Sequence, residues 1–311
     1  MASLMAQARK LRKEYPGVVA LKSLDLAVPA GEVFGLVGPN GAGKTTLLNV
    51  LATAIRPDYG RASIAGFDIE KEPREVRRRL GYMPDFFNLY DEMTAADFIT
   101  YFGLVFGVEQ AVLPGRVDAL LKEVNLEAKR DAKIGELSRG MRQRLVFAKT
   151  LVHDPDVLLL DEPLAGLDPL ARMEMREILR GLGSKGKTVI ISSHILTELS
   201  DFCSMVGIME KGEMKLCGRI DETLERFRAD RLVTVEVLQN GDQARELLKP
   251  LTDLVLEPGT GAVIKFRCHE RETIAAANAA LVAAGLRVVS LSEEKGDIED
   301  LYFKVAMHEV S

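Results

Sequence analysis

Cysteines and long apolar runs are scarce in this sequence of 311 residues. Its three cysteines, Cys203, Cys217 and Cys268, form no CxxC pair, so we expect a reducing compartment and neither a disulfide scaffold nor a zinc site. The longest apolar run, roughly Phe98 to Val108, is too short to span a bilayer, which takes about 18 residues or more. Residues Met1 to Lys13 lack the apolar core of a signal peptide. Any role at a membrane would therefore require a partner.

An excess of basic residues is also missing. The chain has 41 Lys and Arg against 46 Asp and Glu, a net charge of −5, which argues against general binding to a nucleic-acid backbone. Hydrophobic residues make up 47% and charged residues 28%, which is typical of soluble globular proteins and excludes a largely disordered or collagen-like chain. At about 100–200 residues per domain, the length predicts about two domains.

Up to about residue 215, short apolar runs alternate with amphipathic helical stretches. The runs Val33–Val37, Val157–Leu160 and Thr188–Ile191 show no polar alternation, which is typical of strands buried on both faces of a parallel sheet. Between the last two runs, Asp168 can cap a helix and Gly183 can end it. Strand, helix and strand in this order predict an α/β domain.

The last part of the chain follows a different pattern. From Leu232 to Leu238 apolar residues alternate with polar ones, as in a sheet with one open face. We expect three further strands and an Ala-rich helix between residues 251 and 291, and then a final helix capped by Asp297. The order β-α-β-β-α-β plus a helix predicts a small ferredoxin-like α+β domain. The expected divisions are a domain over residues 1–225, a helical block within it at about 85–155, and an accessory domain over 226–311.

A phosphate-binding motif follows the first of the buried strands. Residues 38–45, GPNGAGKT, match G-x-x-x-x-G-K-[ST] and open a helix whose apolar residues share a face from Leu47 to Ile55. Glycines let backbone N–H groups turn toward phosphate oxygens, Lys44 neutralises the β- and γ-phosphates, and Thr45 coordinates magnesium. A glycine-rich turn with an incidental lysine is the alternative, which the strand–loop–helix context disfavours. The residues predicted to bind nucleotide here are Gly38, Pro39, Asn40, Gly41, Ala42, Gly43, Lys44, Thr45 and Thr46.

Two carboxylates end another of the buried strands. Asp161 and Glu162 follow Val157–Leu160, at the edge where the ligands of open α/β sheets gather. Because hard divalent cations take oxygen ligands, we expect Asp161 to bind magnesium through water. Glu162 is then placed to polarise an attacking water. An ordinary turn after a strand is the alternative, which the phosphate loop in the same chain disfavours.

A third motif lies between these two. Residues 137–144, LSRGMRQR, open a helix, and this segment resembles the signature motif of ATP-binding cassette (ABC) ATPases. The order of the other motifs agrees with that family. Tyr15 lies where the family has an adenine-stacking aromatic, Asp168 ends a segment like the D-loop, and His194 follows a strand where the family has a switch histidine. The resemblance covers about residues 5–220 and implies an α/β ABC-type ATPase fold of the P-loop NTPase class.

The resemblance also implies a dimer that encloses two ATP molecules between the phosphate loop of one subunit and the signature helix of the other. Ser138, Gly140 and the N-terminus of that helix would form a second anion site in trans. Asp168 would reach across the dimer, and His194 would sense the γ-phosphate. Tyr15 would stack on adenine, or would instead pack on the edge of the sheet. The expected catalytic residues are Lys44, Glu162 and His194.

The chain departs from the family pattern in two motifs. Asp85 stands where the family usually has Gln, and its carboxylate can still bind the metal, with a helix cap or turn residue as the alternative. The signature has Arg139 and Met141 where the family has Gly and Gln. An arginine at residue 139 argues against a positive φ there, which only glycine adopts readily, and its side chain could make a charge-assisted contact with the nucleotide. The aromatics from Phe86 to Tyr90 are expected to line a groove for a transmembrane partner, or to pack in the core.

Together these features imply an ATPase subunit that uses ATP and Mg²⁺ to drive export through a separate transmembrane subunit. The variant motifs and the added domain resemble ATPase subunits of bacterial exporters for drugs, polysaccharides or lipids. We expect a second ATPase subunit as partner, no nucleic acid, and a cytoplasmic location at the inner face of the cell membrane. An importer ATPase with a regulatory C-terminal domain and a soluble ABC ATPase are the alternatives. A kinase or GTPase would leave the signature and His194 unexplained, and the sequence has no Asn-Lys-x-Asp motif.

Overall fold

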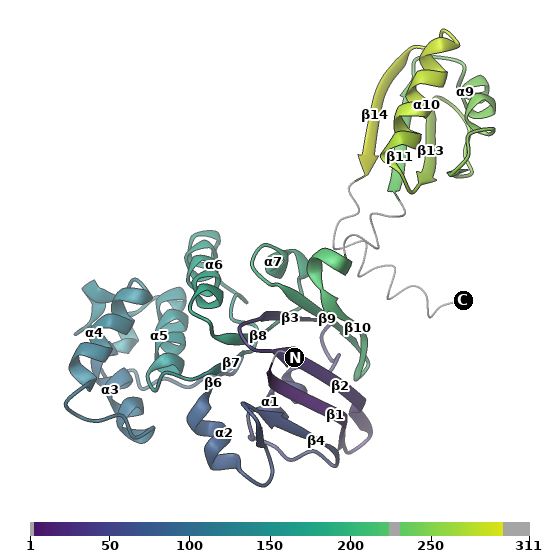
Figure 1. The fold of residues 1–311 in the computed structure, drawn as a ribbon. Coiled ribbons are helices and arrows are strands. Elements are labelled where there is room, and N and C mark those ends of the chain that lie inside the picture. The colour runs from purple at the N-terminus through teal and green to yellow at the C-terminus, as the bar shows by residue number, and fades with distance from the viewer. Residues whose placement is uncertain (1–2, 224–230, 295–311) are drawn as a thin grey trace. The chain divides into compact units, whose positions relative to one another are not determined.

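The computed structural model describes residues 3–223 and 231–294. Contacts between residues divide the chain into two compact units, Met1–Gly218 and Arg219–Ser311 (Figure 1). Each unit has a buried apolar core of its own.

A sheet with parallel strand pairs forms the centre of the first unit. In the described residues its order is β10 (Glu213–Arg219), β9 (Met205–Glu210), β3 (Val33–Val37), β8 (Thr188–Ser193), β7 (Val157–Leu160) and β6 (Leu80–Met83). Strand β3 pairs in parallel with β8 and β9, and β7 pairs in parallel with β6 and β8. All residues of β3, β7 and β8 are buried, which explains the absence of polar alternation and confirms these predicted strands.

An antiparallel sheet lies against the phosphate-loop side of this unit. Its order is β2 (Val18–Pro29), β1 (Leu4–Tyr15), β4 (Tyr59–Ile64) and β5 (Phe67–Asp68). One face contributes alternate residues, such as Leu24 and Leu26, to a core shared with helix α1 (Lys44–Leu51). The helix predicted after the phosphate loop, with apolar residues from Leu47 to Ile55 on one face, is too long. Helix α1 ends at Leu51, and Ile55 packs against this core from beyond the helix.

Helices occupy the segment between β6 and β7. They are α3 (Ala95–Val105), α4 (Leu113–Glu123) and α5 (Arg139–Leu151), which lie together to one side of the parallel sheet (Figure 1). Short 3₁₀ turns at Glu127–Lys129 and Ile134–Glu136 connect α4 to α5. Phe98 and Phe147 are among the largest side chains buried in this block. The sequence predicted helices in this part of the chain, and the structure confirms them.

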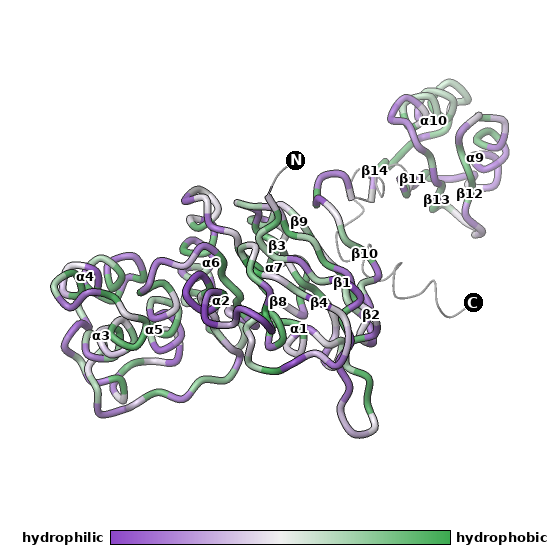
Figure 2. The backbone as a smooth tube through the Cα atoms, turned by 60° about the horizontal axis from the view of Figure 1, so that its bottom comes forward, coloured by the Kyte–Doolittle hydropathy of each residue, from purple (hydrophilic) through white to green (hydrophobic). Residues whose placement is uncertain are grey.

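Three other helices of the first unit flank its sheets. They are α2 (Pro73–Arg79), α6 (Pro169–Ser184) and α7 (Leu196–Ser200). Helix α2 is hydrophilic along most of its length, because four of its seven residues are arginines (Figure 2). Its one buried residue is Val76, which packs into the core shared by the two sheets.

Helix α6 begins as predicted and ends later than predicted. The Asp168 carboxylate accepts a hydrogen bond from the Ala171 N–H at 2.9 Å, so it caps the helix. The predicted end at Gly183 is wrong, and Gly186, with φ of 72°, supplies the left-handed turn instead. A Cβ on Gly183 would come within 3.2 Å of Val33 Cγ2, so this glycine permits close packing of α6 on β3.

The second unit is a four-stranded antiparallel sheet in the described residues, with helices on one face. In chain order its elements are β11 (Arg231–Val237), α9 (Gly241–Leu248), β12 (Leu254–Leu256), β13 (Val263–Cys268), α10 (Arg271–Ala283) and β14 (Val288–Glu294). The strand order is β12-β13-β11-β14. Val233, Val235 and Val237 point into a core with Phe266 and Leu281. The predicted order β-α-β-β-α-β is confirmed, whereas the ferredoxin-like classification stays a prediction and the helix expected at Asp297 lies outside the described residues.

Among the residues that the structure describes, no helix has the length and apolar character needed to cross a membrane.

Candidate functional site

The phosphate loop begins at the end of β3 and leads into α1. Gly43, the N-cap of α1, has a left-handed φ of 103°, and a Cβ there would lie 2.4 Å from the Ala20 carbonyl oxygen, so glycine is required. The Lys44 side chain folds back over the loop, and its Nζ donates to the Gly38 carbonyl oxygen at 2.7 Å. Because Lys44 is only 6% exposed, the loop holds a nearly enclosed positive charge beside a helix N-terminus.

Asp161 lies at the carboxyl end of β7 and is fully buried. Its Oδ1 accepts a hydrogen bond from the Ser192 hydroxyl at 2.5 Å, and the Thr45 hydroxyl also bonds this carboxylate. Burial raises the pKa of Asp161 above its ordinary value of 3.8, and the hydrogen bonds from Ser192 and Thr45 act in the opposite direction. Its Oδ2 has no hydrogen-bond partner among the described residues.

The unpartnered oxygen of Asp161 and the hydroxyl of Thr45 suit a hard divalent cation. Magnesium is held in proteins by one or two carboxylates together with waters and substrate phosphates. No group of three or more His, Cys, Asp or Glu side chains that could hold a metal ion occurs in residues 3–223 and 231–294. A cation at this place would therefore depend on phosphate oxygens as well as on the protein, and the donor set fits magnesium.

Glu162 has a strained backbone and a carboxylate held on both sides. Its φ is +48°, an uncommon value for a residue with a Cβ, and its N–H donates to the Ser192 hydroxyl at 2.9 Å. Its Oε2 lies 2.9 Å from His194 Nδ1, and its Oε1 lies 3.4 Å from Lys44 Nζ. The structure thus places the three predicted catalytic residues Lys44, Glu162 and His194 in one contiguous group.

Ser192 is a member of this site that the sequence pattern places only at the end of a strand. Its hydroxyl joins the two acidic residues, because it donates to Asp161 and accepts from the Glu162 N–H. The parallel register of β7 and β8 pairs Leu160 with Ile191, so the residues that follow are neighbours across the sheet. A hydroxyl residue directly after the apolar run of β8, which ends at Ile191, is the signal that could have identified it.

An open cleft of about 420 Å³ brings together most of the residues predicted to bind nucleotide. The phosphate-loop residues in its lining are Asn40, Gly41, Ala42, Gly43, Lys44, Thr45 and Thr46. Glu162, His194 and Asp85 line it from the ends of other strands, and Tyr15 lines it from the end of β1. Tyr15 is 44% exposed, and Lys13 Nζ lies 5.7 Å from its ring centroid. The cleft has a cationic floor, a carboxylate and an aromatic wall, which suit a nucleotide phosphate chain and base.

Comparison with known proteins identifies the family. The family model described as "ABC transporter" matches residues 21–165. An "Uncharacterized ABC transporter ATP-binding protein" from Synechocystis sp. is 35% identical over 289 residues, which are 92% of this chain and 78% of that protein. The chain belongs to the ABC transporter ATP-binding proteins.

Other members of this family are similar over most of their length. A "Nod factor export ATP-binding protein I" from Cupriavidus pinatubonensis is 34% identical over 307 residues, which are 98% of this chain and 91% of that protein. A solved dimeric ATP-binding cassette in a post-hydrolysis state, bound to ADP and Pi, matches with a TM-score of 0.64 and 25% identity. That match covers 70% of this chain and 99% of the cassette. The protein is therefore an ATP-binding, ATP-hydrolysing subunit of an ABC transporter.

The predicted nucleotide-binding residues Ser138, Gly140 and Asp168 of this ABC ATPase lie outside the cleft described above. Ser138 is exposed and caps α5, because its hydroxyl accepts from the Met141 N–H at 3.3 Å. Gly140 is buried, and a Cβ on it would lie 2.7 Å from Ala171 Cβ, so it permits close packing of α5 on α6. Asp168 caps α6. Within one chain these residues have structural roles, and none of them lines the cleft that contains Lys44.

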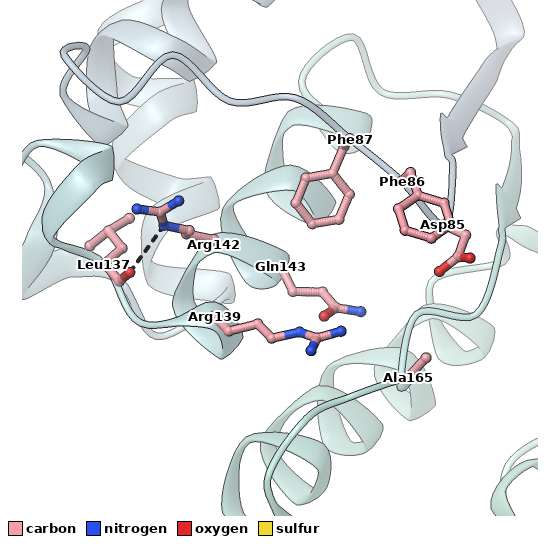
Figure 3. Close-up of a pocket in the computed structure, with 8 residues that line it drawn as sticks. All are labelled: Asp85, Phe86, Phe87, Leu137, Arg139, Arg142, Gln143 and Ala165. Carbon is pink, nitrogen blue, oxygen red and sulfur yellow. Dashed lines mark hydrogen bonds between the residues drawn. The ribbon is translucent and has the colours of Figure 1, made fainter.

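A second cavity, of about 440 Å³, adjoins the first (Figure 3). Its lining consists of Asp85, Phe86, Phe87, Leu137, Arg139, Arg142, Gln143 and Ala165. Phe86 is 90% exposed and Tyr90 is 57% exposed, so the alternative prediction, that these aromatics pack in the core, is wrong for these two residues. Partial burial and the carboxylates of Asp161 and Glu162 raise the pKa of Asp85, whereas Arg139 lowers it.

Proposed function

We propose that this ABC ATPase drives export through a separate transmembrane subunit, and that the residues around Lys44, Glu162 and Asp161 hydrolyse ATP. The observation that carries the proposal is the single cleft in which the phosphate loop meets the Glu162 carboxylate and His194. The export direction is supported by the name of the relative from Cupriavidus pinatubonensis, which matches 98% of this chain.

Lys44, Glu162 and His194 have distinct roles in this proposal. Lys44 Nζ attracts the β- and γ-phosphates into the loop at the N-terminus of α1. When they arrive, Lys44 exchanges its contacts with the Gly38 carbonyl and Glu162 for phosphate oxygens. Glu162 is then free to orient and polarise a water, and His194 Nδ1, 2.9 Å from its carboxylate, holds that carboxylate in place. Tyr15 packs against the base from the end of β1.

Mg²⁺ is the expected cofactor, which Asp161 Oδ2 and Thr45 would hold, with Asp85 contributing from the lining that the two cavities share. Bound there, it would neutralise charge on the phosphates. Asp161 remains ionised at neutral pH only if its burial is offset, and the hydrogen bonds from Ser192 and Thr45 supply part of that offset. These two hydroxyls therefore prepare the carboxylate for a divalent cation.

A second copy of the ATPase completes the site in the proposed closed state. Ser138 is exposed at the start of α5, a 13-residue helix with unpaired N–H groups and a partial positive charge at this end. Ser138, Gly140 and Asp168 do not line the cleft of their own chain, and the exposed Ser138 leaves the N-terminus of α5 available to the ATP of a partner. ATP would thus join two surfaces, and its hydrolysis would shift the population toward the open dimer.

The transmembrane partner is proposed to dock on an exposed aromatic and apolar surface of the helical block. Phe86, Tyr90, Tyr101 and Leu104 are all between 47% and 90% exposed. Tyr90 and Tyr101 contact each other edge to face, with ring centroids 6.5 Å apart. An apolar surface of this kind suits a short cytoplasmic helix of a membrane protein, which supports the proposed location at the inner face of the membrane. We propose no nucleic-acid partner.

The hydrolysis assignment is tested by Glu162→Gln, with Glu246→Gln as the matched control. Glu246 lies on α9 of the second unit, is exposed, and bonds Lys249. We expect Glu162→Gln to lower kcat by about 10²–10⁴-fold, the usual contribution of a general base, while ATP binding persists. Full activity in Glu162→Gln would contradict the assignment.

The partner and direction are tested with the full chain. Purification from detergent-solubilised membranes should recover a membrane protein, and recovery with ribosomes alone would contradict a transport role. Leu104→Glu should keep basal ATPase activity and lose stimulation by that membrane protein. In inside-out vesicles of the complex, ATP outside should drive candidate cargo into the lumen, and movement outward would favour the importer alternative.

A further inference from the structure

Arg139 connects three segments around the second cavity. It is the first residue of α5, and Figure 3 shows its guanidinium extending toward Ala165, with Asp85 on the opposite side of the cavity. Asp85 follows β6, and Ala165 belongs to the turn after β7. One side chain therefore faces both loops that border the ATP cleft.

The guanidinium lies directly on the turn that follows Glu162. A Cβ placed on Gly166 would come within 2.4 Å of Arg139 Cζ and 2.7 Å of its Nη1. Gly166 has a left-handed φ of +65°, and the Ala165 N–H closes the turn by donating to the Glu162 carbonyl oxygen at 3.0 Å. The strained Glu162 backbone and the Arg139 contact thus belong to one short turn.

The charges in the cavity also single out Arg139. The other arginine, Arg142, is engaged by the carbonyl oxygens of Leu137 and Gly135 at 3.1 and 3.0 Å and by Asp91 at 3.3 Å. In the described part of the chain, the Arg139 and Asp85 side chains make no hydrogen bond or ion pair. They carry opposite charges in one cavity, and the carboxylates of Asp161 and Glu162 act on Asp85 from the other side.

We propose that Arg139 is a positioning residue that holds the Gly166 turn in place, and that its positive charge compensates the charge of Asp85 across the cavity that both residues line. Asp85 and Arg139 are also positions at which the sequence departs from the family pattern. The proposal explains both departures by one interaction, because an acidic residue at one position is matched by a basic residue at the other. The inference rests on the proposed role of the cleft in hydrolysis. Loss of Arg139 removes one of the two cations, Arg139 and Lys44, that act on Asp85 against the carboxylates of Asp161 and Glu162, and it frees the turn that presents Glu162.

The contact with Gly166 is tested by thermal unfolding, without an activity measurement. Gly166→Ala introduces a left-handed alanine and also displaces the Arg139 guanidinium, the end of an exposed side chain, from the turn, whereas in an Arg139→Ala background only the first effect remains. We expect Gly166→Ala to lower Tm by at least about 2 °C more in the wild-type background than in the Arg139→Ala background. Equal shifts in the two backgrounds would overturn the contact. If Arg139→Ala does not fold, Arg139→Gln serves as the background.

The charge pair is tested by ATPase kinetics on Arg139→Gln, Asp85→Asn, the double variant, and Arg139→Lys. We expect each neutral variant to lower kcat by about tenfold with KM for ATP changed less than twofold, and the double variant to be no worse than the poorer single variant. Arg139→Lys should recover most of the loss because it restores the charge.

If the fold-losses in kcat of the two single variants multiplied in the double variant, the two residues would act independently and the proposed charge pair would be wrong. Wild-type kcat in Arg139→Gln would also contradict it. The control is Arg78→Ala, which replaces an exposed arginine on α2 that bonds Glu75, and its kinetics should be unchanged. Glu162→Gln reports on hydrolysis separately. If it abolishes turnover while the Arg139 variants behave as wild type, the positioning role fails and the proposed function stands.

Discussion

Removal of the Ser192 hydroxyl should damage both stability and the acidic site. Ser192→Ala deletes the donor to Asp161 Oδ1 at 2.5 Å and the acceptor for the Glu162 N–H at 2.9 Å, and Ser192 is fully buried. A hydrogen bond to a charged group contributes about 1.5–3 kcal/mol, and an unsatisfied buried N–H costs about 1–3 kcal/mol. Because the site adjoins a cleft that water can enter, we expect a loss of about 2–4 kcal/mol at neutral pH.

The loss should depend on pH with a defined sign. Burial raises the folded-state pKa of Asp161 above its ordinary value of 3.8, so the folded protein binds more protons than the unfolded chain between these two pKa values. Stability from this group is full below pH 3.8 and decreases as pH rises through the folded pKa. Ser192 lowers that pKa, so Ser192→Ala raises it further and its destabilisation should be smallest in acid and largest above the folded pKa.

Urea unfolding at several pH values and the pH profile of kcat/KM provide the assays. Because only ionised Asp161 can serve the proposed magnesium, the acid limb of the kcat/KM profile should move to higher pH in Ser192→Ala. Ser193→Ala is the matched control, since Ser193 is also buried but bonds Glu198 at 3.1 Å and the Ile195 N–H at 3.0 Å. A destabilisation below about 0.5 kcal/mol, or an equal shift of the acid limb in both variants, would refute the reasoning.

Three further predictions concern packing and capping. Gly140→Ala should destabilise the protein by about 1–3 kcal/mol in urea, because its Cβ would lie 2.7 Å from Ala171 Cβ, and Ala171→Gly should restore most of the loss. Asp168→Ala should cost about 1 kcal/mol by uncapping α6, whereas Asp168→Ser should cost less than half of that if the cap is the cause. Phe266→Ala should lower the unfolding free energy of the second unit by about 3–5 kcal/mol and leave ATPase activity intact, because Phe266 belongs to a core separate from that of the cleft; lost activity would contradict this.

Local patterns in the sequence predicted the elements that carry the site. The strands β3 and β7 were predictable because a strand buried on both faces needs a continuous apolar run, and each of them is such a run. The start of α6 was predictable because capping by Asp168 involves atoms three residues apart. The phosphate loop was predictable for the same reason, since Gly43 and Lys44 act within a few residues of each other.

Contacts between distant residues could be determined only by the tertiary structure. Ser192 meets Asp161 because the register of two parallel strands brings together residues 31 apart, and no local pattern encodes a register. Gly183 was predicted to end a helix, but α6 continues to Ser184, and Gly183 instead permits the close approach of Val33 on β3. Arg139 was expected only to contact nucleotide, and its position on the Gly166 turn depends on how α5 packs against β6 and α6. Backbone chemistry within a few residues thus determined the elements and the phosphate loop, whereas packing between elements determined which side chains share the site.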